Sequence, residues 1–449
     1  MIVNIIGAGI AGCECADILA RNDIYVRLYE MKRIKKTDAH KSDYFSELVC
    51  SNSLKSESIT NACGLLKKEM SYFNSLFIEA AYQSKVEAGQ ALAVDREKFS
   101  RYITKRIRNN ENIEIIEEEV TNVLDVLKRN EVTVIATGPL TTEPLSKSIK
   151  TLLGHDSLFF YDAAAPIVEA DSIDMTKAFK MDRYGDKEGG DYINLGMNKE
   201  EYLNFYNNLV NAKVAERKDF DKLKLFEGCM PIEHMAKRGE KTLTFGMLKP
   251  VGLNNPKTGE KYYAVAQLRS ENIHKTAYNL VGFQTSLTFG EQKRVFSMLP
   301  GLENANFLRY GVMHKNVYIN ANKVVDKKLK LKKKYFKVYN DVYFAGQISG
   351  VEGYVESAAS GMTIAINILS KLHQSDIEFS DETMIGALSK YVATENEDYQ
   401  PMNANFGIIR PLTLEDGVKK IDKKTKYERY ANRSIAIIEE IKRKLSFPI

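Results

Sequence analysis

The sequence has no tryptophan and few cysteines, and this scarcity limits the kinds of site it can hold. Only 5 cysteines occur in 449 residues, at positions 13, 15, 50, 63 and 229. The number is odd, no two cysteines form a CxxC pair and no histidine pair lies near them, so neither a disulfide framework nor a metal site is predicted. Cys13 and Cys15 fall on the first predicted helix, where a small buried core side chain is the simplest interpretation.

Long hydrophobic runs are also missing. No apolar stretch approaches the ~20 residues needed to span a bilayer. The first six residues lack the charged start and long apolar segment of a signal peptide. We therefore expect a cytoplasmic protein with no membrane contact, and no obligate protein partner is evident. The length of 449 residues suits two domains, or one domain interrupted by an insertion.

Strong net charge is absent as well. The formal charge is +5, which alone does not imply nucleic acid. Two segments are nevertheless basic, at 323–337 and at 419–444. Each is interpreted as either a solvated, charge-protected surface or an RNA contact. The candidate RNA-binding lysines of the first segment are Lys327, Lys328, Lys330, Lys332, Lys333 and Lys334.

A dinucleotide-binding fingerprint opens the chain. Residues 2–6 form an apolar run typical of a buried strand, a helix is predicted to about residue 21, and 24–30 has the pattern of a second strand. The turn between the first strand and the helix contains the glycine motif, and the second strand ends in an acid. The predicted cofactor-binding residues here are Gly7, Ala8, Gly9, Ile10, Ala11, Gly12 and Glu30. The glycines allow close backbone approach to a pyrophosphate at the helix N-terminus, and Glu30 is placed to bind ribose hydroxyls.

Two later strands, at 132–138 and 341–347, also end in glycine. Such strand ends are common in flavoproteins and favour FAD over NAD as the tightly held cofactor. They add Thr137, Gly138, Gly346 and Gln347 to the predicted site. The predicted fold is therefore α/β: a discontinuous Rossmann-like FAD-binding domain, residues 1–155 and 302–449, with an inserted α+β domain at 156–301. Within the insertion we expect a polar loop at 184–190, a helix at 199–214 and a strand at Thr242–Phe245.

Two cysteines lie in segments that indicate chemistry. They are Cys50, in Glu47-Leu-Val-Cys-Ser-Asn-Ser53, and Cys229, in Phe226-Glu-Gly-Cys-Met-Pro231. A thiolate is a soft nucleophile, and a redox cofactor beside paired thiols occurs in few enzyme classes. The alternative for both is ordinary packing of a small buried residue.

These motifs resemble those of the folate- and FAD-dependent RNA uracil-5-methyltransferases (the TrmFO type), over essentially the whole chain. Besides the glycine loop and the two thiol segments, the matching stretches are Arg27-Leu-Tyr-Glu-Met31, Ala91-Leu-Ala-Val-Asp-Arg96, Phe160-Tyr-Asp-Ala-Ala-Ala-Pro166, Lys249-Pro-Val-Gly-Leu253, Gly290-Glu-Gln-Lys-Arg294, Pro300-Gly-Leu-Glu-Asn-Ala305, Arg309-Tyr-Gly-Val-Met-His314, Gly350-Val-Glu-Gly-Tyr-Val-Glu-Ser357 and Gln400-Pro-Met-Asn-Ala-Asn-Phe-Gly407. The chain departs from the family at Gln90, Ser286, Phe289 and Leu195-Gly196. These departures leave the activity class unchanged.

The resemblance implies formation of 5-methyluridine in RNA. A methylene group would come from 5,10-methylenetetrahydrofolate, and NADH or NADPH would supply electrons through FAD. Cys229 would add to uracil C6 and Cys50 would act near the flavin, although the two roles are exchangeable. Gly353 and Tyr354 would hold flavin or folate, while Arg96 and Lys249 would hold phosphate or the folate glutamate, or form ordinary surface ion pairs.

The resemblance leaves the RNA open between a tRNA T-loop uridine and a 23S rRNA uridine, since one branch of the family modifies 23S rRNA. The target base has to leave its stack to react. Three alternatives remain at this point. They are a FAD oxidoreductase for a small molecule with Cys50 and Cys229 as a redox pair, a relative of the flavoproteins that modify the tRNA wobble uridine, and an RNA-binding protein with little turnover.

Overall fold

The computed structural model describes most of the chain. It covers residues 1–37, 39–127, 131–154, 158–183, 189–215, 230–333, 341–375, 377–397, 399–413 and 421–447, with the backbone alone at 158–163 and 314–315. Cys229, Lys334 and most of the predicted loop at 184–190 lie outside these residues. No helix among the described residues is long and apolar enough to cross a bilayer.

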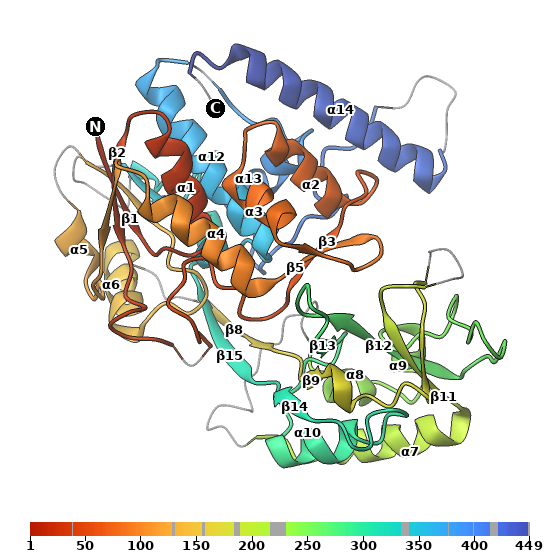
Figure 1. The fold of residues 1–449 in the computed structure, drawn as a ribbon. Coiled ribbons are helices and arrows are strands. Elements are labelled where there is room, and N and C mark those ends of the chain that lie inside the picture. The colour runs from red at the N-terminus through yellow and green to blue at the C-terminus, as the bar shows by residue number, and fades with distance from the viewer. Residues whose placement is uncertain are drawn as a thin grey trace.

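A five-stranded parallel sheet forms the centre of the larger lobe (Figure 1). Its order is β16-β7-β1-β2-β6, and every neighbouring pair is parallel. The strands are β1 (Ile2–Ile6), β2 (Tyr25–Tyr29), β6 (Ile113–Ile116), β7 (Val132–Ile135) and β16 (Val342–Phe344). The strand after residue 341 thus pairs with a strand from the first 135 residues. The predicted α/β, Rossmann-like fold is confirmed, with the sheet assembled from both ends of the chain.

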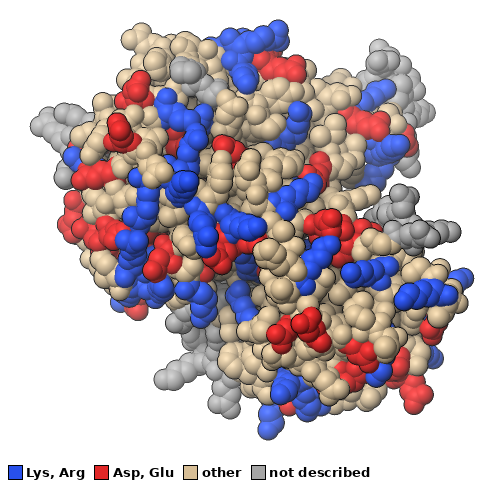
Figure 2. Space-filling model, viewed as in Figure 1, with Lys and Arg blue, Asp and Glu red and all other residues tan. Residues whose placement is uncertain are grey.

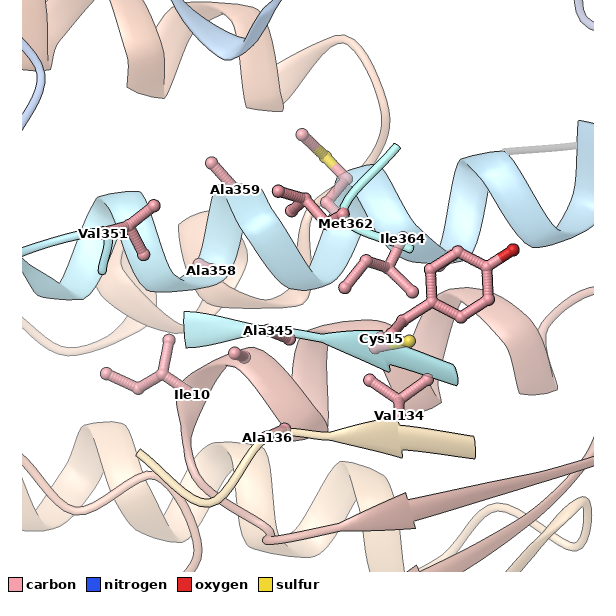
Figure 3. Close-up of a cluster of buried hydrophobic side chains, with 14 of the residues drawn as sticks. Ile10, Cys15, Val134, Ala136, Ala345, Val351, Ala358, Ala359, Met362 and Ile364 are labelled. Atoms are coloured by element: carbon pink, nitrogen blue, oxygen red, sulfur yellow. The ribbon is translucent and has the colours of Figure 1, made fainter. Parts of the chain in front are cut away.

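Two helices from opposite ends of the sequence pack against each other beside this sheet. They are α1 (Ile10–Ala20) and α12 (Tyr354–Leu372). A Cβ on Gly361 would lie 2.1 Å from the Ala11 carbonyl oxygen, so only glycine allows this approach. Figure 3 shows apolar side chains of both helices and of the strands meeting here, including Cys15 and Met362. Cys13 and Cys15 are buried, as predicted.

Shorter elements complete the larger lobe. The remaining helices are α2 (Ala62–Ser71), α3 (Leu76–Gln83), α4 (Arg96–Arg108), α5 (Val123–Val126), α6 (Glu143–Leu153), α11 (Ala321–Val324), α13 (Met384–Ala393) and α14 (Lys423–Lys444), with a 3-10 turn η5 (Gly346–Ser349). A small antiparallel sheet contains β3 (Ser53–Ser56), β4 (Lys85–Val86) and β5 (Ala91–Val94).

A second lobe has its own antiparallel sheet and its own core. The strand order is β10-β11-β12-β13-β9-β14, and its apolar side chains form a separate buried cluster. Its elements are β9 (Ile167–Glu169), η1 (Ala170–Ser172), β10 (Ala178–Lys180), β11 (Ile193–Met197), α7 (Lys199–Val210), α8 (Ile232–Ala236), α9 (Thr242–Phe245), β12 (Ala264–Ser270), β13 (Ala277–Leu280), α10 (Phe289–Phe296) and β14 (Phe307–Arg309). The antiparallel pair β8 (Leu158–Ala163) and β15 (Met313–Tyr318) connects the two lobes (Figure 1).

One element was predicted wrongly. Thr242–Phe245 is the short helix α9 rather than a strand. Threonine and phenylalanine favour strands, but β propensity is a weak preference that local context overrides. The segment lies between Gly239 and Gly246 and closes on itself through a bond from the Gly246 N–H to the Leu243 carbonyl. The domain boundaries at 155/156 and 301/302 stay a prediction. The core of the second lobe includes Leu302 and Ala305, and its sheet includes β14, so this lobe extends past residue 301.

Candidate functional site

The glycine loop after β1 has the backbone geometry that requires glycine. Gly7 has φ +104°, and a Cβ there would lie 2.6 Å from the Ala136 carbonyl oxygen. A Cβ on Gly12 would lie 2.0 Å from the Gly7 carbonyl oxygen. A Cβ on Gly9 would meet its nearest atom only at 3.9 Å. The loop is therefore packed tightly on its inner side and open at Gly9, where α1 begins.

A groove runs over this loop and along the carboxyl ends of the parallel strands. Its empty volume, counted to its open mouth, is about 1110 Å³. Most of the predicted cofactor-binding residues line it: Gly7, Ala8, Gly9, Ile10, Ala11, Glu30, Thr137, Gly138, Gly346, Gln347 and Tyr354. His40, Glu47 and Val49 line it as well. The structure thus brings together segments that are far apart in the sequence.

Two predicted residues do not line the groove. Gly12 serves packing, as described above. Gly353 has φ +117°, and a Cβ there would lie 2.2 Å from Glu356 Oε2, so this glycine permits the turn into α12. Both act on the backbone that shapes the groove.

Glu30 is held in place at the glycine loop. Its Oε2 accepts the Ala8 N–H at 2.9 Å and its Oε1 accepts the Lys32 N–H at 2.9 Å. A carboxylate oxygen has a second acceptor site, so each remains able to accept a hydroxyl. The glycine loop, the helix N-terminus and a fixed acid together fit the adenosine diphosphate portion of a dinucleotide.

Cys50 is joined to the groove through Tyr354. The Cys50 N–H donates to the Tyr354 hydroxyl at 2.8 Å, and the Ser51 N–H lies 3.4 Å from the same oxygen. Burial raises the pKa of Tyr354, so the hydroxyl stays a neutral phenol at physiological pH. Tyr354 lines the groove and Cys50 is half-buried beside it. The thiol segment and the groove therefore form one continuous site.

Three arginines hold the segment that carries Cys50. Arg96 donates to the carbonyls of Leu48 (2.6 Å) and Cys50 (3.3 Å). Arg309 donates to the Val49 carbonyl at 2.7 Å. Arg269 donates to Ser51 Oγ and to Asn52 Oδ1, both at 3.0 Å. Consecutive residues of the segment are thus fixed by side chains from both lobes.

The arginines also set the charge around the thiol. Arg96 is paired with Glu271 at 2.7 Å, and it interacts electrostatically with Cys50. Arg309 also interacts electrostatically with Cys50. Burial, together with the nearby charge of Arg96, lowers the pKa of Arg309. Positive charge of this kind attracts a thiolate, which suits a chemically active cysteine.

Arg269 and Arg309 were missed as site residues from the sequence. Arg309 begins one of the family stretches quoted above, which was the only local signal for it. Arg269 lies on β12 and no motif marks it. Arg96 was predicted as a site residue, and it contacts the Cys50 segment. Lys249, also predicted, does not line the groove, and its backbone carbonyl accepts a hydrogen bond from Arg183.

The helix that follows Cys229 in the chain, α8, contributes Glu233 to a buried polar cluster. Glu233 accepts the Thr285 hydroxyl at 2.9 Å and the Ser286 N–H at 2.7 Å, and it also bonds the Ser286 hydroxyl. His234 Nε2 is buried with no hydrogen-bond partner among the described residues, and burial lowers the pKa of this imidazole. Ser286, where the family commonly has histidine, is therefore an integral member of the cluster.

Three lysines of the 323–337 segment have partners on the protein. Lys327 pairs with Glu378 at 3.3 Å and Lys330 with Asp341 at 2.5 Å. Lys332 Nζ donates to the carbonyls of Asn322 and Lys323, both at 3.3 Å. These contacts favour the solvated-surface interpretation, and RNA binding by this segment stays a prediction.

The sequence is similar to those of known proteins over almost its whole length. Residues 2–376 match the family model described as glucose inhibited division protein A. A protein of *Fusobacterium nucleatum* named methylenetetrahydrofolate–tRNA-(uracil-5-)-methyltransferase TrmFO is 54% identical over 438 residues, covering 97% of this chain and 98% of its own length. Proteins with the same name from *Caldicellulosiruptor bescii* (54%, covering 99% and 100%) and *Staphylococcus aureus* (50%, covering 99% and 99%) also match.

The solved structure of *Aquifex aeolicus* GidA superimposes on 99% of this chain and 74% of its own, with a TM-score of 0.67 and 16% identity. At that identity the likeness concerns the fold alone. The full-length matches at 50–54% identity show the family as well as the fold. The chain belongs to the TrmFO family.

Proposed function

We propose that this protein forms 5-methyluridine in tRNA, with methylenetetrahydrofolate as the carbon donor. The observation that carries the proposal is the full-length match to enzymes named for this reaction, at 54% identity, in a chain whose Cys50 segment lies on the groove. The printed names of these relatives specify tRNA, which favours tRNA over 23S rRNA. Action in the cytoplasm stays a prediction.

The groove suits FAD. The backbone of Gly7 to Ala11 and the N-terminus of α1 would hold the pyrophosphate, and Glu30 the ribose hydroxyls. Thr137, Gly138, Gly346 and Gln347 would border the rest of the cofactor, with the Tyr354 ring at its end. Bound there, FAD would supply electrons that it receives from NADH or NADPH.

The chain's own residues position and activate the reacting groups. One thiolate would add to uracil C6, which makes C5 nucleophilic, and Cys229 is the first choice for this step. Cys50 would remain beside the groove, oriented by the Tyr354 hydroxyl and by Arg96, Arg269 and Arg309. The reverse assignment of the two thiols is equally compatible with the chemistry.

The proposal is tested by transfer of label from methylene-labelled 5,10-methylenetetrahydrofolate into an unmodified tRNA transcript, with FAD, NADH and NADPH present. We expect label in the RNA with the wild-type protein, and a loss of at least about 100-fold in Cys50→Ala and in Cys229→Ala. Cys15→Ala is the matched control, since Cys15 is buried in α1 away from the groove.

A small-molecule FAD oxidoreductase is the competing function. It predicts a yellow protein that oxidises NADH or NADPH but places no label in RNA under any condition. It also predicts a disulfide between Cys50 and Cys229, which peptide mapping without reductant would detect. Label in RNA that persists in both cysteine variants would contradict the assigned thiol roles while keeping the activity.

A further inference from the structure

The first turns of α14 carry a basic and aromatic surface. Phe406 packs on two tyrosines of the helix, with ring centroids 4.3 Å from Tyr427 and 5.6 Å from Tyr430. Lys423 lies over the Tyr427 ring at 5.5 Å and Lys426 over the Tyr430 ring at 5.6 Å. We call this surface the α14 patch; its members are Phe406, Lys423, Lys424, Lys426, Tyr427, Arg429 and Tyr430.

The cations of the α14 patch have no acidic partner among the described residues. Lys423, Lys424, Lys426 and Arg429 are exposed and form no ion pair with a carboxylate in the part of the chain that the structure describes. At the other end of the helix, by contrast, Lys444 pairs with Glu440 at 2.5 Å. The first turn contains no acid beyond the N-cap Asp422, so Lys423 and Lys424 stand where the helix macrodipole disfavours cations. Their charge does not serve the helix, and it is available to a partner.

The α14 patch is linked to the site by a short chain of contacts. The Ala404 N–H, two residues before Phe406, donates to Glu356 Oε1 at 2.9 Å. Lys55 pairs with the same carboxylate oxygen at 3.1 Å, and its side chain is 44% exposed. Lys55 follows the Cys50 segment in the chain, and Glu356 follows Tyr354 on α12. Lys55, which follows the Cys50 segment, and the segment that contains Phe406 therefore meet at one carboxylate, that of Glu356.

We propose that the α14 patch binds the phosphate backbone of the RNA whose target uridine enters beside Cys50. Lysine and arginine supply the salt-dependent share of RNA affinity, and phosphate contacts fix the position of the RNA without reading its sequence. The rings that support Lys423 and Lys426 hold these ammonium groups in place. Figure 1 shows α14 beginning on the side of the inserted lobe, and Figure 2 shows Lys and Arg atoms at that end of the molecule with Asp and Glu atoms among them. The proposal rests on the proposed function.

The test compares two variants of the full-length protein with equal loss of charge. The first is Lys423→Gln/Lys424→Gln/Lys426→Gln, and the control is Lys442→Gln/Arg443→Gln/Lys444→Gln, at the other end of the same helix. Binding of an unmodified tRNA transcript is measured across a salt series, and label transfer is measured alongside. Thermal unfolding and FAD content confirm folding. Lys424→Glu, at an exposed side chain with no ring contact among the described residues, is a milder second variant.

We expect the first variant to reduce the slope of log affinity against log salt by about 2, which corresponds to three lost phosphate contacts. Affinity at ~0.1 M salt should fall roughly 10- to 100-fold and the KM for tRNA should rise accordingly, with kcat at saturating RNA nearly unchanged. The control should behave as wild type. A slope and KM equal to those of the control would overturn the proposal.

Failure of the two proposals can be told apart. RNA binding is measured independently of turnover, so a wild type that binds but never transfers label contradicts the proposed function alone. A wild type that transfers label, with a first variant that binds RNA normally, contradicts the α14 patch alone. A wild type that does not bind RNA contradicts both.

Discussion

At the scale of single residues, the Tyr354 hydroxyl is the link between cofactor groove and thiol. Its ring lines the groove, and its oxygen accepts the Cys50 N–H at 2.8 Å. One side chain thus sets the distance between whatever occupies the groove and the segment that carries Cys50. Positioning of this kind contributes strongly to catalysis, because small displacements of reacting groups are costly.

Tyr354→Phe removes the hydroxyl and keeps the ring, so it tests the contribution of the hydroxyl alone. The ring still lines the groove, so FAD should be retained, but the Cys50 N–H loses its acceptor and the segment loosens. We expect label transfer to fall roughly 10- to 100-fold and stability to fall by about 1–3 kcal/mol. Tyr202→Phe, which removes a buried hydroxyl in the inserted lobe bonded to the Glu240 carbonyl, is the control. Equal activity in the two variants would show that the Tyr354 hydroxyl does not position the Cys50 segment for the reaction.

Glu14 gives a prediction about pH. It is buried on α1, and burial raises its pKa to about 7 from an ordinary value of 4.5. A carboxyl with a raised folded-state pKa contributes stability that is fully present below about pH 4.5 and is lost as pH rises through about 7.

Glu14→Gln should remove this dependence. Between pH 4.5 and 8 the wild type should lose about 3 kcal/mol of unfolding free energy relative to the variant, since each pKa unit is worth about 1.4 kcal/mol. Urea denaturation at a series of pH values measures the difference. Parallel pH profiles for the two proteins would show that Glu14 is ionised in the folded state.

At the scale of elements, the Cys50 segment is shaped by both lobes together. Arg96 comes from α4, while Arg269 and Arg309 come from β12 and β14 of the inserted lobe. Their hydrogen bonds to consecutive backbone and side-chain groups of the segment make its conformation depend on how the inserted lobe sits. The inserted lobe therefore contributes to the site beyond any surface it offers to RNA.

Arg309→Gln should reveal that dependence. The Val49 carbonyl loses a charged donor, so we expect slower label transfer, roughly 10- to 100-fold, with unchanged FAD content. Alkylation of Cys50 by iodoacetamide, followed by mass spectrometry, reports on the segment independently of turnover. Arg294→Gln, which removes a surface partner of Glu291 in the same lobe, is the control and should leave both readouts unchanged.

The contact between α1 and α12 gives a second prediction at this scale. Gly361→Ala would place a methyl group 2.1 Å from the Ala11 carbonyl oxygen, beside the glycine loop. We expect a loss of about 1–3 kcal/mol of stability and weaker retention of FAD. Gly290→Ala has no atom within 4 Å of the new methyl group and is the matched control. An unchanged melting temperature and flavin content in Gly361→Ala would contradict the close contact between Gly361 and Ala11.

At the scale of the whole molecule, some features could be predicted from the sequence and others could not. The β1–α1–β2 unit and its glycine loop are local, so spacing alone located Gly7 to Gly12 and Glu30. The strand ends at Gly138 and Gly346 followed from glycine at the end of apolar runs. Arg269 reaches Ser51 and Asn52 only through the fold of the inserted lobe, and no local pattern records those contacts. Cys229 was singled out by its segment and given a role by the family resemblance, and it lies outside the described residues.

The central claim is that one groove combines flavin, folate and RNA chemistry. The most direct measurement offers the purified protein unmodified tRNA and a 23S rRNA fragment side by side, with labelled 5,10-methylenetetrahydrofolate and NADH or NADPH, and identifies the product nucleoside by mass spectrometry. We expect labelled 5-methyluridine in tRNA with the wild-type protein and none with Cys50→Ala. Labelled 5-methyluridine in 23S rRNA alone would overturn the assignment of tRNA. No labelled nucleoside in either RNA, from a protein that holds FAD, would contradict the account as a whole.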